Sequence, residues 1–240
     1  MPDQVAANEL SLGGATVVEL VPSIAPESFG LGYAALNLTA ALERAGVNVY
    51  LSSVDEEKVA RMACEEARFP QERLVRGSLI GPSRLRMALF LVRKLSSIPN
   101  NGKVIVHSHG MWTYTSYVAG KLRKRWECPH VQSPHGELEP YALTISPNKK
   151  ALASLLYARR NLAEASCMWA LSEQEKASIQ AHGFTGQVAV IPNGVQRADL
   201  CTEVEVAEFK KRHDMALGSR VLLFLSRIAR KKNLYIKIIL

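Results

Sequence analysis

Residues 16–51 read TVVELVPSIAPESFGLGYAALNLTAALERAGVNVYL. The first six of them are rich in β-branched side chains and predict a short strand. A turn-rich loop follows, and a helical pattern of apolar residues then runs to Gly46, a residue type that commonly ends helices. Residues 47–51 form a second β-rich run. The segment therefore predicts one βαβ unit.

The same alternation continues to residue 191. Ser172 and Glu175 have the spacing of a helix-capping box, so a helix is expected to begin after Ser172. Strictly alternating strands and helices predict an α/β fold with a doubly wound, Rossmann-like parallel sheet, whose ligand cleft lies at the carboxyl ends of the strands. The other expected helices are at residues 55–67, from 84 onward, 117–126 and 149–164, and the other strands are near 74 and at 103–107, 130–133, 167–171 and 188–191.

The pattern changes after residue 195. A polar segment leads into a charged helix that is expected to end near His213, and residues 220–225 (RVLLFL) then read as a strand buried on both faces. A basic loop and the start of a helix follow. We predict a first domain at residues 1–198, a linker and helix at 199–218, and at 219–240 the first strand and helix of a second, truncated Rossmann-like domain.

The composition is that of a globular protein. Of 240 residues, 48% are hydrophobic and 22% charged, and no apolar run approaches the length of a membrane-spanning helix. The first residues have neither a basic region nor an apolar stretch, so we expect a cytoplasmic protein without a cleaved signal. The four cysteines are scattered without a C-x-x-C pair, and the net charge of +8 favours an acidic partner.

Gly30 and Gly32 are expected in the loop between the first strand and the first helix. Glycine there lets the backbone approach a ligand, and the helix amides can face an anion. An ordinary structural turn is the alternative. No third glycine follows at the distance of the dinucleotide fingerprint, which disfavours a nicotinamide enzyme.

Histidines and a tryptophan follow the strand at residues 103–107. His107 and His109 are two apart, so on a strand they point to the same side. A metal site would need a third ligand that the sequence does not place, so we expect no metal. Sugar recognition by His109 and Trp112 is the favoured interpretation.

The strand at residues 130–133 ends in SPHGELEPY. A neutral His135 can hydrogen-bond a sugar hydroxyl or a phosphate, and Gly136 and Glu137 are expected at the same cleft. Glu137 and Glu139 are too close in sequence to straddle a substrate as the carboxylate pair of a glycoside hydrolase does. One of the two glutamates is expected either to support neighbouring site residues or to contact the acceptor, and a solvated helix start is the alternative.

Arg227 and Lys232 flank the helix expected after RVLLFL. Both can converge with helix amides on a diphosphate, whereas a solvated basic loop is the alternative. Two further stretches, residues 84–95 and 149–162, combine apolar residues with lysine and arginine. Such helices lie either on an anionic membrane or against a protein core.

Several stretches, taken in chain order, resemble the retaining GT-B glycosyltransferases of the group 1, or family 4, type, in particular the exopolysaccharide and lipopolysaccharide branch. They are FGLGYAALNLTAALERAGVNV, VHSHGMWTY, SPHGELEPYAL, ALSEQEKASI, VIPNGV and LSRIARKKNL.

The resemblance implies transfer of a hexose from a nucleotide diphosphate sugar to a glycan or polyprenyl-linked acceptor, without cofactor or metal. It implies peripheral contact with the cytoplasmic face of the inner membrane and no nucleic-acid partner. His135 would be catalytic, Gly30, Gly32, His109, Trp112, Gly136 and Glu137 would line the acceptor side, and Arg227 and Lys232 would neutralise the donor diphosphate.

Most of the second domain with which that family holds the donor, including that domain's pair of glutamates seven residues apart, does not occur in these 240 residues. We therefore expect the 240 residues alone to be inactive, and an inactive remnant that binds acceptor or membrane is the alternative function. A sugar-nucleotide epimerase of the same fold resembles these motifs less well. A nucleic-acid-binding protein is disfavoured because no recognition motif accompanies the basic charge.

Overall fold

The computed structural model describes residues 14–81, 86–99, 101–195, 200–216, 218–221 and 223–226. The chain divides into two compact units, Met1–Gly194 and Val195–Leu240, and each is described by itself. The predicted division at residues 198 and 218 stays a prediction.

The first unit is built on a seven-stranded sheet with the order β3-β2-β1-β6-β7-β8-β9. Every neighbouring pair is parallel, as predicted for a doubly wound α/β fold. The order reverses beside β1, which pairs with β2 on one edge and with β6 on the other. The strands are β1 (Thr16–Leu20), β2 (Asn48–Ser53), β3 (Leu74–Arg76), β6 (Val104–His109), β7 (His130–Ser133), β8 (Cys167–Ala170) and β9 (Val188–Val190).

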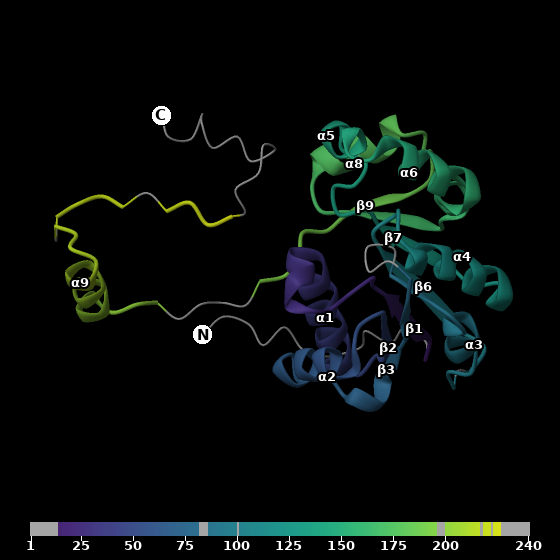
Figure 1. Cartoon of the computed structure of the whole chain (residues 1–240), viewed down its shortest axis with the longest axis horizontal. Coiled ribbons are helices and arrows are strands. Elements are labelled where there is room, and N and C mark those ends of the chain that lie inside the picture. The colour runs from purple at the N-terminus through teal and green to yellow at the C-terminus, as the bar shows by residue number, and fades with distance from the viewer. Residues whose placement is uncertain are drawn as a thin grey trace. The chain divides into compact units, whose positions relative to one another are not determined.

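Helices cover both faces of this sheet (Figure 1). Single turns of 3-10 helix, η1 (Pro26–Ser28) and η2 (Gln71–Arg73), and a π-helical stretch, η4 (Ser154–Ala158), complete the unit. The α-helices are α1 (Phe29–Arg44), α2 (Glu57–Glu66), α3 (Leu91–Ser96), α4 (Tyr114–Trp126), α5 (Pro140–Thr144), α6 (Pro147–Ala153), α7 (Arg159–Glu164) and α8 (Glu173–Ala181).

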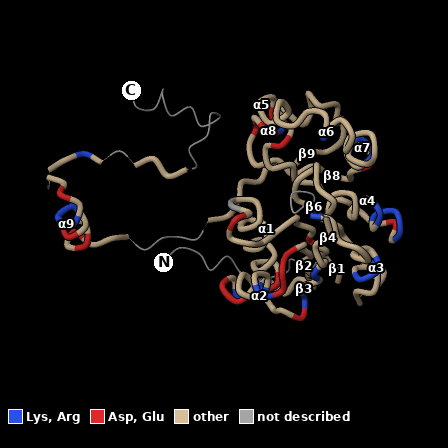
Figure 2. The backbone as a smooth tube through the Cα atoms, in the orientation of Figure 1, with Lys and Arg blue, Asp and Glu red and all other residues tan. Residues whose placement is uncertain are grey.

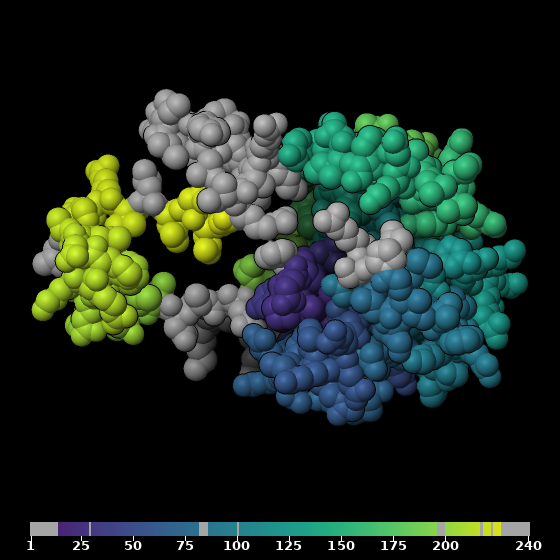
Figure 3. Space-filling view, in the orientation of Figure 1, coloured from purple at the N-terminus to yellow at the C-terminus, as the bar shows by residue number. Residues whose placement is uncertain are grey.

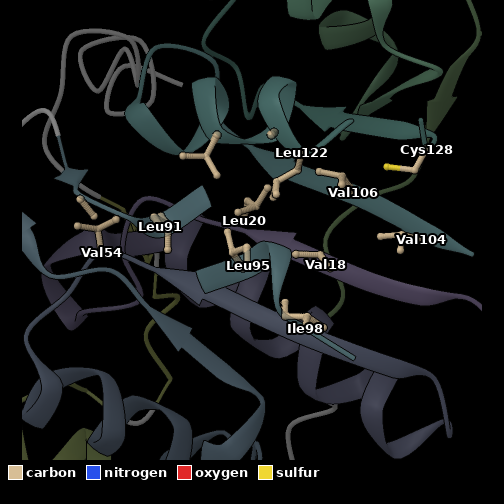
Figure 4. Close-up of a cluster of buried hydrophobic side chains, with 13 residues drawn as sticks. Val18, Leu20, Val54, Leu91, Leu95, Ile98, Val104, Val106, Leu122 and Cys128 are labelled. Carbon is tan, nitrogen blue, oxygen red and sulfur yellow. The ribbon is translucent and has the colours of Figure 1, made fainter. Parts of the chain in front are cut away.

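The core has a separate cluster on each face of the sheet, because side chains alternate along a strand. Val18 and Leu20 of β1 pack with residues of α3 and α4 (Figure 4), whereas Val17 packs with residues of α1 and α2. A third cluster, around Met168 and Ile179, lies where β8 meets α8. Figure 3 shows the first unit, purple to green, as a closely packed body. This packing fixes the strand ends at which the candidate site lies.

Helix α1 ends as its sequence predicts. Gly46 has a φ of +81°, and its amide donates to the Glu43 carbonyl while the Val47 amide donates to the Leu42 carbonyl. This is the Schellman arrangement, which satisfies carbonyls that the end of a helix leaves free. The chain then turns directly into β2.

Gly32 is a point of close packing within α1. A Cβ atom there would lie 2.0 Å from the Ser28 hydroxyl oxygen and 2.4 Å from the Ser23 backbone carbonyl oxygen, whereas one at Gly30 would meet nothing within 4 Å. We expect Gly32→Ala to lower the free energy of unfolding by about 1–3 kcal/mol, because the Ser23–Ser28 loop must move. Gly30→Ala is the matched control and should be neutral or stabilising by up to about 1 kcal/mol. Urea unfolding midpoints measure both, and equal midpoints for the two variants would refute the packing role.

The prediction of a helix from residue 84 onward is wrong for the first half of that segment. Met87–Ala88 forms the short strand β5, which pairs antiparallel with β4 (Leu79–Ile80), and residues 82–85 lie outside the described part. Phe90 then adopts a left-handed φ of 60°, so α3 begins only at Leu91. Ala88 is buried in this antiparallel pair. A helix would have had to bury Ala88 on its apolar face instead.

The second unit contains α9 (Glu203–Arg212), whose C-cap is His213, which agrees with the predicted end near His213. Its first turn is closed by a capping box between Thr202 and Glu205. The strand expected at residues 220–225 is wrong, because the described residues of that stretch form none, and Leu223 and Leu225 are 80% and 88% exposed. An apolar strand needs neighbouring strands on its edges, and the described residues of this unit supply none. Arg227 and Lys232 lie outside the described residues.

The basic residues of the first unit lie largely on outer helices. Figure 2 shows lysine and arginine along α3 and α4, and acidic positions on α2. Among the described residues, none of the helices combines the length and the apolar character that crossing a membrane requires.

Candidate functional site

The candidate site lies where the strand order reverses, at the carboxyl ends of β1, β6 and β7. The register pairs Glu19 of β1 with His107 of β6, and His109 of β6 with Ser133 of β7. Open α/β sheets bind their ligands at such a switch point, because the loops from the two halves of the sheet diverge there.

Glu19 is the centre of the site. Its Oε2 atom lies 2.9 Å from His107 Nδ1 and 2.9 Å from His109 Nε2, and all three side chains are buried. His107 and His109 therefore point to the same side of β6, as their spacing predicts. The sequence analysis missed Glu19, although a carboxylate within an otherwise apolar strand was a signal.

A continuous hydrogen-bonded chain runs from Glu19 toward His135. His109 Nδ1 lies 2.8 Å from His135 Nε2, and the two rings meet edge to edge with their centroids 5.1 Å apart. A side branch joins His107 Nε2 to the Ser133 hydroxyl, also at 2.8 Å. His135 is half-buried and has a left-handed φ of 54°.

The charge states of Glu19, His109 and His135 follow from their burial and their neighbours. Burial alone would raise the pKa of Glu19, but the adjacent imidazoles outweigh it and lower the pKa to about 2. Burial lowers the pKa of His109, and burial together with the neighbouring histidines lowers that of His135 to about 3. Near neutral pH the carboxylate is therefore ionised, and these two imidazoles are neutral.

Two glutamates, the half-buried Glu137 and the buried Glu175, hold the loop that carries His135. Glu137 Oε2 accepts a 2.6 Å hydrogen bond from the Met111 amide, and burial raises the Glu137 pKa. Glu175 accepts from the Gly136 amide at 2.6 Å and from the Leu171 amide at 2.7 Å, while the Ser172 hydroxyl caps α8. In this structure Gly136 and Glu137, both predicted to line the cleft, fasten one loop to its neighbours.

The tryptophan of the predicted site packs elsewhere. Trp112 lies against the third core cluster and makes an edge contact with His182 at 6.4 Å, and its Nε1 is buried without a partner among the described residues. Trp169 of β8 instead stacks on His107, with ring centroids 5.2 Å apart. No local pattern in the sequence indicated that Trp169 would lie at the site.

Gly30 and Gly32 lie in the first turn of α1, not in the preceding loop as predicted. Gly30 is exposed, and Gly32 is buried against Ser23 and Ser28. That loop is held by Asp55, whose carboxylate accepts hydrogen bonds from Ser23, Ile24 and Arg86 at 2.5, 2.8 and 2.9 Å. Gly32 therefore serves internal packing.

Glu19, His107 and His109 also offer three potential ligand atoms within 4.8 Å of one another, so Glu19 occupies the position that a third metal ligand would need. Both nitrogens that face Glu19 already lie at hydrogen-bond distance from it. A metal ion would have to displace the protons of both contacts. The arrangement fits a series of hydrogen-bonded side chains better than a metal site.

The comparisons with known proteins agree with this fold. The sequence profile of the glycosyl transferase 4-like domain matches residues 29–194. No curated protein matches the sequence.

The solved structures that share the fold include the following three. Anabaena HepE in complex with UDP is 16% identical, with a TM-score of 0.58 over 83% of this chain and 50% of that one. The UDP-GlcNAc 2-epimerase of Neisseria meningitidis bound to UDP-GlcNAc is 14% identical, with a TM-score of 0.52 over 73% of this chain and 45% of that one. S. aureus MnaA with UDP is 13% identical, with a TM-score of 0.51 over 91% of this chain and 51% of that one. The chain thus spans about half the length of these proteins.

Proposed function

The chain belongs to the glycosyl transferase 4-like family, and we propose on that basis that its first unit is the acceptor-side part of a nucleotide-sugar-dependent glycosyltransferase. The proposed reaction is transfer of a hexose, with retention, to a glycan or polyprenyl-linked acceptor in bacterial exopolysaccharide or lipopolysaccharide synthesis. The observation that carries the proposal is the family match over residues 29–194, the part of the chain that contains the histidine cluster.

His135 is proposed as the catalytic residue of this unit. It is the half-buried end of the hydrogen-bonded chain from Glu19, and its neutral ring can hydrogen-bond an acceptor group. A group that contacts the acceptor at the carboxyl ends of the strands can help to remove its proton as the new bond forms. His109 holds that ring through the 2.8 Å contact between its Nδ1 and His135 Nε2.

Arg227 and Lys232 are proposed to bind the donor diphosphate, and this assignment gives the test of the proposed function. We expect UDP and UDP-hexoses to bind the chain, with UDP or GDP preference read from calorimetric titration. Arg227→Ala and Lys232→Ala should each weaken binding about 10-fold or more, because each removes a charge-assisted hydrogen bond to the diphosphate. Lys124→Ala, on the exposed surface of α4, is the matched control and should not change the affinity.

A chain that binds none of these nucleotides would remove the donor assignment. The alternative, an inactive unit that binds only acceptor or membrane, would then take its place. Binding that both alanine variants retain would place the diphosphate elsewhere.

Peripheral membrane contact is proposed for the helical segment at residues 147–164. Leu152, Leu155 and Leu156 are 59%, 83% and 67% exposed there, and the segment lies on the outer surface of the first unit (Figure 3). Lys149, Arg159 and Arg160 are exposed on the same segment. Exposed leucines bordered by basic residues suit the surface of an anionic membrane.

Vesicle sedimentation tests this contact. We expect the chain to bind vesicles of phosphatidylglycerol and phosphatidylcholine, and the double variant Leu155→Ser, Leu156→Ser to lower the partition about tenfold or more, because two apolar side chains no longer enter the lipid. Met62→Ser on α2, which changes a residue 59% exposed, is the control. Equal partition of all three proteins would exclude the helical segment as the contact.

A further inference from the structure

The hydrogen-bonded chain from Glu19 to His135 has a direction, and that direction decides what His135 can bind. We infer that Glu19, acting through His109, fixes the proton of His135 on Nε2, so that Nδ1 presents a lone pair and takes a hydrogen bond from a hydroxyl of the ligand. Glu19 is a positioning residue in this scheme. The identification of that hydroxyl as one of the acceptor sugar rests on the proposed function, but the proton arrangement does not.

The first step is at the buried carboxylate. An ionised carboxylate only accepts hydrogen bonds. His109 Nε2, which lies 2.9 Å from Glu19 Oε2, must therefore carry a proton and donate it. Because His109 is neutral, its other nitrogen, Nδ1, is left with a lone pair.

The second step is the contact between the two rings. A nitrogen–nitrogen distance of 2.8 Å requires one proton between His109 Nδ1 and His135 Nε2. His109 Nδ1 has none to give, so His135 Nε2 donates. In a neutral His135, Nδ1 is then the unprotonated nitrogen, and no group in the described part of the chain hydrogen-bonds to it.

The third step concerns the ligand. A lone pair attracts an O–H or N–H group and repels the oxygens of a fully ionised phosphate, which have no proton to offer. The geometry therefore selects a hydroxyl group over a phosphate at this position. The His107 branch ends differently, because its Nε2 already has the Ser133 hydroxyl as partner.

Imidazole nitrogen spectroscopy tests the inference without any activity assay. In the ¹⁵N-labelled 240-residue chain near neutral pH, long-range ¹H–¹⁵N correlation should show Nε2 of His135 with the shift of a protonated nitrogen and Nδ1 with that of an unprotonated one. The His135 signals are identified by their loss in His135→Asn. A proton on Nδ1 of wild-type His135 would overturn the inference, whatever the variants do.

Glu19→Gln tests the control by the carboxylate. A glutamine amide can donate as well as accept, so both nitrogens of His135 should move toward intermediate shifts as the second tautomer becomes populated. Ser133→Ala is the matched control, since it breaks a hydrogen bond of the same cluster on the His107 branch and should leave His135 unchanged. A folded Glu19→Gln protein with wild-type His135 shifts would overturn the role of Glu19.

Sulfate tests the ligand class, because it offers no proton. A sulfate-dependent shift of His135 Nδ1 would contradict the preference for a hydroxyl. If the tautomer is as stated but a protein that also contains the donor-binding residues shows no glycosyl transfer, the proposed function fails and the inference stands. If transfer is found with the opposite tautomer, the inference alone fails.

Discussion

Lowering the pH from neutral to about 4 will unfold the first unit, because buried imidazoles must then take up protons. Burial lowers the pKa of His130, which is fully buried, to about 3, and burial and nearby histidines lower that of His135 to about 3. In the unfolded chain both titrate near the ordinary histidine value of 6.5. Below that pH the unfolded state binds protons that the folded state does not, so stability falls as the pH falls.

The expected size of this effect is large. A pH of about 4 is about 2.5 units below the pKa that both groups have in the unfolded chain. At about 1.4 kcal/mol per unit, each group then lowers the free energy of unfolding by about 3 kcal/mol. Together they approach the whole stability of a typical domain, which is about 5–15 kcal/mol. His109 shifts in the same direction, and Glu19 adds a further loss below its unfolded value of 4.5 because its folded pKa is about 2.

Urea unfolding midpoints between about pH 8 and pH 5 measure the effect before most carboxylates titrate. The midpoint should fall steadily below about pH 6.5. His130→Asn removes one of the buried imidazoles and should make the pH dependence shallower by up to one proton. A midpoint that stays constant across this range would show that the imidazoles titrate in the folded protein with the same pKa values as in the unfolded chain.

Replacing His135 with asparagine should lower the rate of glycosyl transfer by about 10²- to 10⁴-fold, the usual contribution of a positioned acid or base. Asparagine is the suitable replacement, because position 135 has a φ of 54° and asparagine tolerates the left-handed region better than most residues do. The fold should therefore persist. Initial rates with a UDP-hexose donor, in a protein that contains whatever donor-binding residues transfer requires, measure the loss.

His182→Asn is the matched control for this prediction. His182 is exposed and follows α8, and its ring makes an edge contact with the ring of Trp112. Its replacement should leave the rate within about twofold. A His135→Asn enzyme that also transfers at the wild-type rate would remove His135 from the mechanism and leave it a structural role.

The sequence predicts the sheet well because most of its strands and helices have local residue patterns that mark them. The apolar run at residues 103–107, the glycine after α1 and the Ser172 cap each define an element boundary without help from distant residues. The same local logic places His107 and His109 on one side of a strand end.

The centre of the site is a non-local feature, and local patterns do not reveal it. Glu19 meets His107 only because β1 pairs with β6 in a particular register, across 88 residues of sequence. Trp169 reaches His107 from a third strand. Tertiary pairing also explains the errors: residues 87–88 join a hairpin instead of a helix, and residues 220–225 lack neighbouring strands among the described residues.

The central position of β1 has a consequence for synthesis of the chain on the ribosome. One edge of β1 can pair as soon as β2 is made, but the other waits for β6, about 88 residues later. At about 5–20 residues per second, that edge stays open for about 4–18 s. During this interval the Glu19 carboxylate places a charge within the apolar strand TVVEL, and such charges oppose pairing with other nascent chains.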